Sequence, residues 1–164
     1  MENHEKIEIV KDIVNSTRIC MLCTMDSSGS LYSRPMATQE IRDDLSVYFF
    51  SGKDSGKITE IKSDSDVNLS YSKPGSNDYL SISGSAALID DMSIKKELWS
   101  PMAKAWFPEG VESDNLIVIK VTPSSAEFWN ATESKLEMFW NIGKALLTGK
   151  KYSGNEGDHG ELKM

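Results

Sequence analysis

The stretch Phe49–Ile61, FFSGKDSGKITEI, contains the residue types that hold a phosphate group. An aromatic run ends at Ser51, and two glycines, Ser55 and Lys57 follow before a helical pattern begins. Glycines let a backbone approach a ligand closely, and the amides at the N-terminus of a helix favour an anion. Hydroxyls and a lysine ammonium add hydrogen-bond donors and positive charge. One interpretation of this stretch is therefore a phosphate cradle.

The stretch differs from the phosphate loop of nucleoside triphosphatases. That loop requires the pattern G-x-x-x-x-G-K-[ST], whereas Gly52 and Gly56 are one residue too close and Ile58 occupies the Ser/Thr position. Glycine-rich loops between a strand and a helix are also common as plain polar connectors. Residue types and spacing leave both interpretations open: a phosphate cradle, or a connector with an ordinary helix N-cap.

A second candidate is SRPMA, residues 33–37, within an expected strand. Proline cannot donate to a strand ladder, so Pro35 indicates an edge or a bulge. A bulge leaves backbone groups free to meet the polar edge of a planar ligand, and Arg34 could supply a forked donor. By itself, however, the pattern favours an edge strand with a solvated arginine.

The aromatic residues are expected in the core by default. The motif WFPEG at 106–110 is different, because it follows a helical pattern and precedes a loop. An aromatic side chain at that place could cap a ligand pocket.

The sequence contains few candidate residues for nucleophilic catalysis or for a metal site. The two histidines, His4 and His159, lie in the polar ends of the chain, so a Ser-His-Asp or Cys-His site has no base. Cys20 and Cys23 form a C-x-x-C pattern. On a strand, such positions point to opposite faces about 10 Å apart, too far for a disulfide. A zinc site would need two further ligands. We expect two reduced thiols and no metal.

The elements that must position these residues indicate a mainly-β chain. Apolar periodicity and turn residues predict strands at 17–25, 31–41, 45–51, 66–73, 79–89, 115–121 and 125–130, with a bulge at Gly84 and a break at Pro123. Helices are predicted at 5–14, 55–63, 90–105 and 134–148. Seven strands with short turns favour a small closed or nearly closed β-barrel with peripheral helices.

The chain suits a single domain. We expect it to cover residues 1–150, followed by a disordered Gly-rich and charged tail at 151–164. In the helix predicted over 90–105, one face would contain Met92, Leu98, Met102 and Trp106.

The formal net charge of −7 and the isoelectric point near 4.9 limit the partners. An acidic surface argues against nucleic acid or an anionic membrane as the main partner. A small anionic ligand in a local pocket remains compatible with it. No apolar run is long enough to span a bilayer, and the amphipathic start lacks the apolar segment of a secretory signal, which predicts a cytoplasmic protein.

Taken in order, these stretches resemble the pyridoxamine 5'-phosphate oxidase-like, FMN-binding split-barrel superfamily, and within it the general stress protein 26 group. The similarity covers residues 7–149 and rests on the joint order of SRPMA, YFFSGKDSGKITEI, VNLSY, LSISGSA, WFPEG and VTPSSAEFW. The resemblance implies an antiparallel, Greek-key-like split barrel. It also implies that FMN binds between the two subunits of a homodimer.

The resemblance further implies which residues contact FMN. A run in the second strand would lie along the isoalloxazine ring, and the end of the third strand with the following loop would hold the phosphate. One tryptophan would line the pocket, and another would approach the flavin from the partner chain. In that order, the implied residues are Arg34, Pro35, Met36 and Ala37; Phe50, Ser51, Ser55 and Lys57; Trp106; and Trp129.

The chain also departs from the oxidase pattern. Gly56 stands where the oxidases have a basic residue, Gln39 where they have a lysine, and residues 80–82 or their immediate neighbours where they have Gln-Val-Arg; the oxidases' C-terminal Arg-Leu-His signature is absent. Those groups hold the pyridoxamine substrate in the family, so oxidation of pyridoxamine phosphate is not expected.

Two functions follow from the resemblance. The first is an FMN-binding protein that acts as an FMN-dependent oxidoreductase of unknown substrate with a general-stress role. The alternative is a non-enzymatic flavin binder, carrier or sensor module, since fold does not fix chemistry. The pocket could also hold another phosphorylated or planar ligand, such as a different flavin or haem, although the lack of a core histidine argues against haem. No residue is identified as catalytic.

Overall fold

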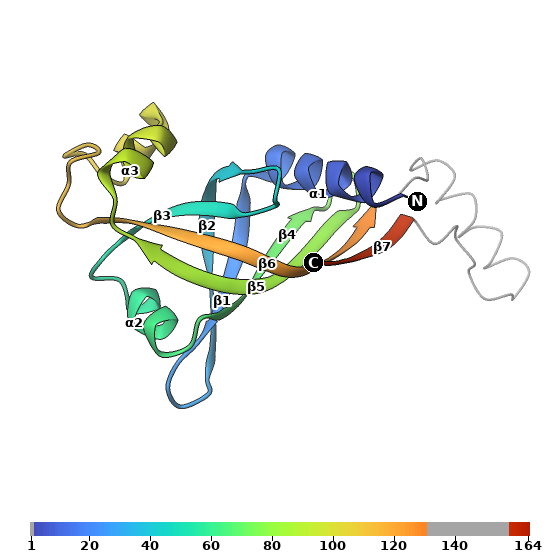
Figure 1. Cartoon of the computed structure of the whole chain (residues 1–164), viewed down its shortest axis with the longest axis horizontal. Helices are drawn as coiled ribbons and strands as arrows, with labels where there is room; N and C mark the ends of the chain where they lie inside the picture. Colours follow the sequence, from blue (N-terminus) through green and yellow to red (C-terminus); the bar gives the residue numbers. More distant parts are fainter. Residues whose placement is uncertain (1, 131–157) are drawn as a thin grey trace, which may run out of the picture.

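The computed structural model describes residues 2–130 and 158–164, whose strands form one antiparallel sheet that closes on itself (Figure 1). The strands are β1 (Ile19–Met25), β2 (Leu31–Ile41), β3 (Val47–Gly52), β4 (Asp66–Lys73), β5 (Asp78–Ile89), β6 (Leu116–Asn130) and β7 (Asp158–Lys163). Their order is β3-β2-β1-β4-β5-β6, and β3 also pairs with β6, while β7 extends the sheet from β6. The predicted mainly-β barrel is therefore confirmed.

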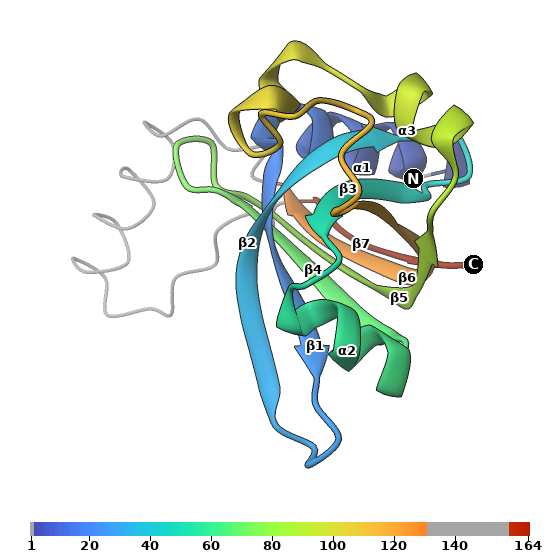
Figure 2. The same cartoon turned by 90° about the vertical axis from the view of Figure 1, so that its left-hand side faces the viewer.

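The helices lie outside the barrel, as expected. They are α1 (Asn3–Thr17), α2 (Gly56–Ser63), α3 (Met92–Leu98) and the 3₁₀ helix η1 (Pro101–Ala105). Helix α2 lies beside β1 at one end of the barrel, and α3 lies at the opposite end (Figure 2). Within the described residues, no helix is long and apolar enough to cross a membrane.

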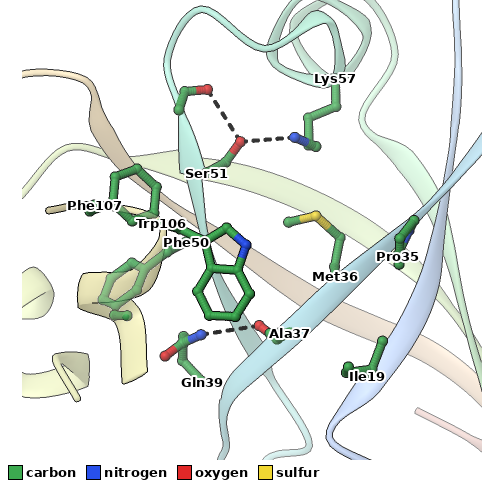
Figure 3. A pocket seen from close by; sticks show the side chains of 12 residues that line it. Ile19, Pro35, Met36, Ala37, Gln39, Phe50, Ser51, Lys57, Trp106 and Phe107 are labelled. Carbon is green, nitrogen blue, oxygen red and sulfur yellow. Dashed lines mark hydrogen bonds between the residues drawn. The ribbon is translucent and has the colours of Figure 1, made fainter. Parts of the chain in front are cut away.

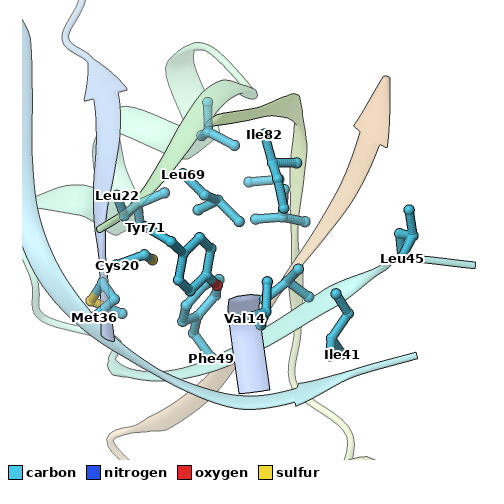
Figure 4. Packing of buried hydrophobic residues seen from close by; sticks show 14 of the residues in the cluster. Val14, Cys20, Leu22, Met36, Ile41, Leu45, Phe49, Leu69, Tyr71 and Ile82 are labelled. Atoms are coloured by element: carbon cyan, nitrogen blue, oxygen red, sulfur yellow. The ribbon is translucent and has the colours of Figure 1, made fainter. Parts of the chain in front are cut away.

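Alternating side chains fill the barrel interior. Residues such as Leu69 and Ile82 are fully buried, and Phe49 and Tyr71 lie in the middle of the cluster (Figure 4). The Tyr71 hydroxyl shares a 2.7 Å hydrogen bond with Thr38, so its polar end is satisfied. This packing lets the barrel wall carry a pocket on its outer side without exposing the core.

The two cysteines lie on opposite faces of β1, as expected. Cys20 is buried and Cys23 is partly exposed, and neither forms a disulfide. Burial raises the pKa of the Cys20 thiol to about 12. Cys20 therefore behaves as a small neutral core residue.

The predicted bulge at Gly84 is confirmed. The pairing of β5 with β6 shifts register between Ser83 and Gly84. A Cβ atom at Gly84 would lie 2.2 Å from the carbonyl oxygen of Thr122. The two backbones approach each other so closely here that only glycine fits.

Gly84→Ala is expected to lower the free energy of unfolding by about 1–3 kcal/mol, because the new methyl group forces two backbones apart. Urea unfolding measures the change. Gly75→Ala is the matched control, since a Cβ atom at Gly75 would meet nothing within 4 Å. Equal stability of the two variants would contradict the close approach.

The predicted break at Pro123 is wrong, because β6 runs unbroken from Leu116 to Asn130. β3 pairs with β6 only as far as Val121, and β7 begins to pair at Ser125. Pro123 falls between these two partners, and it faces the bulge on β5. Its missing N–H therefore removes no bond from a regular ladder.

The helix predicted over 90–105 is also corrected. Pro101 divides it into α3 and the 3₁₀ helix η1, because the residue before a proline is forced out of the α-helical conformation. Of the four residues expected on one face, only Leu98 is buried, and Met92, Met102 and Trp106 are exposed. The change of axis at the proline breaks the helical periodicity.

The chain end differs from the expected disorder over 151–164. Asp158–Lys163 form β7, which pairs with the second half of β6 and buries Leu162. The end of β6 that extends beyond its pairing with β3 needs a partner for its backbone groups, and β7 supplies one. Residues 151–157 and the helix predicted over 134–148 lie outside the described residues.

Candidate functional site

A pocket of about 380 Å³ opens beside β2 and β3, under the segment that contains η1 (Figure 3). It is elongated: Ser51 and Lys57 lie at one end, Gln39 lies at the other, and Trp106 lies between them. The full lining comprises Ile19, Pro35, Met36, Ala37, Gln39, Phe50, Ser51, Gly52, Lys57, Ala103, Trp106 and Phe107.

The polar end is a small hydrogen-bond network. The Lys57 ammonium donates to the Ser55 hydroxyl at 2.6 Å and to the buried Ser51 hydroxyl at 3.2 Å. Ser51 in turn donates to the carbonyl oxygen of Gly52. Ser55 is the N-cap of α2, as predicted, but its hydroxyl does not cap the helix amides. The Ile58 N–H donates to the Ser55 carbonyl oxygen at 2.9 Å, so the Gly56 and Lys57 amides are the first-turn donors left for an external anion.

Lys57 is the cation of this end. Burial lowers the pKa of Lys57, and the nearby charge of Arg34 lowers it further, while Glu60 and Asp54 act in the opposite direction. A bound anion would therefore stabilise the charged form of this lysine.

Aromatic side chains form one wall of the pocket. Phe50 at the end of β3 packs against Trp99, with ring centroids 5.8 Å apart, and edge-on against Phe107 at 6.4 Å. These contacts fix the chain around η1 against the barrel. Trp106 remains 67% exposed although it lines the pocket, so its indole ring is free to stack on a ligand.

The opposite wall comes from β2 and its neighbour β1. Pro35, Met36 and Ala37 line the slot, together with the half-exposed Ile19, which pairs with Ala37 across the two strands. The Gln39 amide donates to the carbonyl oxygen of Ala37 at 3.2 Å. The slot between the two walls is thus apolar along its length and ends at an amide group.

Pro35 lies where β2 is an edge strand, as predicted. Pairing of β2 with β3 begins only at Thr38, so the earlier residues of β2 pair with β1 alone within the described part of the chain. The absent proline N–H therefore costs no bond on the open side.

The expectation of a solvated arginine beside it is wrong. Arg34 contacts Glu60 on α2 at 2.9 Å and donates to the Thr24 hydroxyl at 2.7 Å. Burial opposes ionisation of Glu60, but hydrogen bonds from Thr24 and Arg34 and the guanidinium charge outweigh it, so the pKa of Glu60 is lowered. Arg34 therefore does not line the pocket but ties β2 to α2.

Trp129 also lies outside the pocket of its own chain. It is 42% exposed on β6 and stacks on His159 of β7, with centroids 5.4 Å apart. The His159 ring is held in turn by Glu127 at 2.7 Å. Trp129 therefore does not line the pocket of its own chain. Its exposed position is compatible with the expected contact to a flavin bound by a partner chain.

The other residues implied by sequence cluster as a group. Seven of the ten line the pocket, and Ser55 reaches it through Lys57. The lining residues not selected from the sequence are Ile19, Gln39, Gly52, Ala103 and Phe107. Phe107 follows Trp106 in WFPEG, and Gln39 lies two positions after Ala37 on the same strand face, so both had a local signal.

Comparison with known proteins agrees with this architecture. The family described as pyridoxamine 5'-phosphate oxidase like matches residues 5–153. Protein bli-3 of Neurospora crassa is 27% identical over 162 residues, which cover 93% of this chain and 78% of that protein.

Solved structures agree as well. The general stress FMN/FAD binding protein from Xanthomonas citri is 28% identical with a TM-score of 0.71, over 80% of this chain and 93% of that one. A general stress protein 26 structure from Jannaschia sp. CCS1 shares the fold at 22% identity and a TM-score of 0.77, over 98% and 99% of the two chains. The match over most of the sequence and the closed antiparallel barrel agree, and the chain belongs to the pyridoxamine 5'-phosphate oxidase-like family.

Proposed function

We propose that this pocket binds FMN. The observation that supports it is the order of groups along one elongated pocket: a lysine with two serine hydroxyls, then an aromatic and apolar slot, then an amide. FMN has the matching order of a phosphate, a flexible chain and a flat ring with a polar edge. The phosphate would lie at Lys57 and the ring between Trp106 and the β2 wall.

A relative supports the class of ligand. The Xanthomonas citri protein is named as an FMN/FAD binding protein. In this chain the single lysine and two hydroxyls at a helix N-terminus suit one terminal phosphate group, which favours the mononucleotide.

The chemistry would come from the flavin. Among the described lining residues, Lys57 is the one titratable side chain with a charged form, and it lies at the phosphate end. The chain would orient the ring and exclude water from one of its faces, while the bound flavin carries hydride or electrons. We therefore propose flavin binding as the core function, with an FMN-dependent oxidoreductase as its catalytic form.

A homodimer is part of the proposal. Ile19 and Met21 expose apolar surface on the β1–β2 face beside the pocket, and Leu31, which pairs with Met25, is exposed on the same face. Contiguous apolar surface of this kind is typical of a protein interface. A second copy seated there would close the open side of the slot and bring its Trp129 toward the ring.

Absorbance of freshly purified protein, followed by titration with FMN and riboflavin, tests the proposal. We expect flavin absorbance bands and binding of FMN at least about tenfold tighter than that of riboflavin, since only FMN has the phosphate. Bleaching of the bound flavin by NAD(P)H would support the oxidoreductase. A colourless protein that takes up neither flavin would overturn the proposal.

A further inference from the structure

The chain that forms the aromatic wall is bonded at both of its ends to the loop that forms the phosphate end. We call residues 52–56 the phosphate loop and residues 90–115 the wall segment. At the C-terminal end of the wall segment, the Asn115 side chain accepts the Asp54 backbone N–H at 3.3 Å and donates to the Asp54 carboxylate at 3.0 Å. The Asn115 carbonyl oxygen accepts the Lys53 N–H at 2.8 Å. Asn115 therefore makes three hydrogen bonds to two successive loop residues.

The N-terminal end of the wall segment is attached by an ion pair. Asp90 contacts the ammonium of Lys53 at 2.6 Å and that of the buried Lys95 on α3 at 2.5 Å. Hydrogen bonds from Lys53 and Lys95 lower the pKa of Asp90 to about 2, so the carboxylate stays charged at neutral pH. The same loop residue, Lys53, is thus held from both ends of the wall segment.

The surroundings of Gly52 show how closely the phosphate loop packs against the Asp54–Asn115 pair. A Cβ atom at Gly52 would lie 2.6 Å from the Asp54 carboxylate and 3.0 Å from the Asn115 amide nitrogen. The loop therefore fills the space under the Asp54–Asn115 pair. Neither member of that pair lines the pocket.

We propose that Asn115 is a positioning residue for the phosphate end of the pocket. By holding Asp54, it fixes the path of the phosphate loop between Ser51 and the N-terminus of α2. Ser51 and Ser55, both bonded to the Lys57 ammonium, then stay together beside the N-terminus of α2. The inference rests on the proposed binding of FMN. It means that Asn115, which lies outside the pocket, contributes to the preference for a phosphorylated flavin.

Asn115→Ala separates this role from a general loss of structure when FMN and riboflavin are titrated in parallel. We expect the dissociation constant of FMN to rise about fivefold to tenfold, the effect of one to two lost hydrogen bonds. Riboflavin lacks the phosphate, so its dissociation constant should change by less than about twofold.

A charge-neutral exchange tests the pair itself. Asn115→Asp alone places two carboxylates opposite each other and should weaken FMN binding at least as much as Asn115→Ala. Asp54→Asn combined with Asn115→Asp restores one carboxylate and one amide with the roles reversed. This double variant should return FMN affinity to within about twofold of the original chain.

Hydrogen exchange in the ligand-free protein provides a second measurement that needs no flavin. Amides of the phosphate loop should exchange faster in Asn115→Ala, and the double variant should restore their protection. Unchanged exchange, or an equal loss of FMN and riboflavin affinity, would overturn the role of Asn115. Failure of the unaltered chain to bind either flavin would instead overturn the proposed function and leave the exchange result to decide on Asn115.

Discussion

Lys57→Ala is expected to weaken FMN binding by about tenfold to a hundredfold, whereas riboflavin binding stays within about twofold. The Lys57 ammonium is half-buried and bonded to the Ser51 and Ser55 hydroxyls, which hold it in one place. A charge-assisted contact to a phosphate from such a fixed group contributes about 1–3 kcal/mol. Titration of flavin fluorescence at constant ionic strength measures both ligands.

The control is Lys62→Ala. Lys62 lies in the last turn of the same helix and is exposed. Its replacement by alanine removes the same positive charge as Lys57→Ala. It should leave FMN affinity unchanged, because surface charges far from the site are screened by salt. Ser55→Ala should give a smaller loss than Lys57→Ala. Superimposable titrations of the original chain and Lys57→Ala would show that the phosphate lies elsewhere, and an equal loss in Lys62→Ala would indicate an effect of net charge only.

Phe128→Ala is expected to lower the free energy of unfolding by about 3–5 kcal/mol. Phe128 is fully buried on β6, where it pairs with Leu80 of β5 on one side and with Gly160 of β7 on the other. Its ring packs against the backbone of Gly160, where an added Cβ atom would lie 2.3 Å from it. Removal of the ring leaves a cavity and also weakens the attachment of the final strand.

Trp129→Ala is the matched control, because it removes a large aromatic side chain from the next position of the same strand. Trp129 points away from the core and should cost about 1 kcal/mol or less. Urea unfolding followed by far-UV circular dichroism avoids dependence on tryptophan fluorescence. Comparable losses for the two variants would contradict the burial of Phe128.

Local sequence determined most strands because burial on one face leaves a period of two in the sequence. The strands at 31–41 and 66–73 match their predicted bounds, since turn residues lie at both ends of each. The latter strand also alternates Val67, Leu69 and Tyr71 with polar residues. The bulge at Gly84 was also predictable, because a glycine within a strand indicates close backbone approach. The same holds for Ser55, a residue type favoured at helix N-caps.

Predictions from the sequence were wrong where the conformation of a residue depends on a partner far away in the chain. Pro123 suggested a break, but the pairing of β6 with β3 ends at Val121 and its pairing with β7 begins at Ser125, so Pro123 lies between the two partners. The end of the chain suggested disorder, but β6 offers it a free edge. Arg34 suggested a surface residue, but Glu60, which lies 26 positions later, neutralises it. Each outcome depends on contacts that composition and spacing do not contain.

By itself, the sequence determined the barrel, helices α1 and α2 and the residue types of a phosphate-binding loop, because these leave periodic or local patterns. Only the tertiary structure decided that Lys57, Gln39 and Trp106 line one elongated pocket, and that Arg34 and Trp129 do not. It also revealed Asn115, whose bonds to the loop span 61 positions of sequence. The physical reason is that closing the sheet joins β3 to β6, which brings together segments that no local pattern relates.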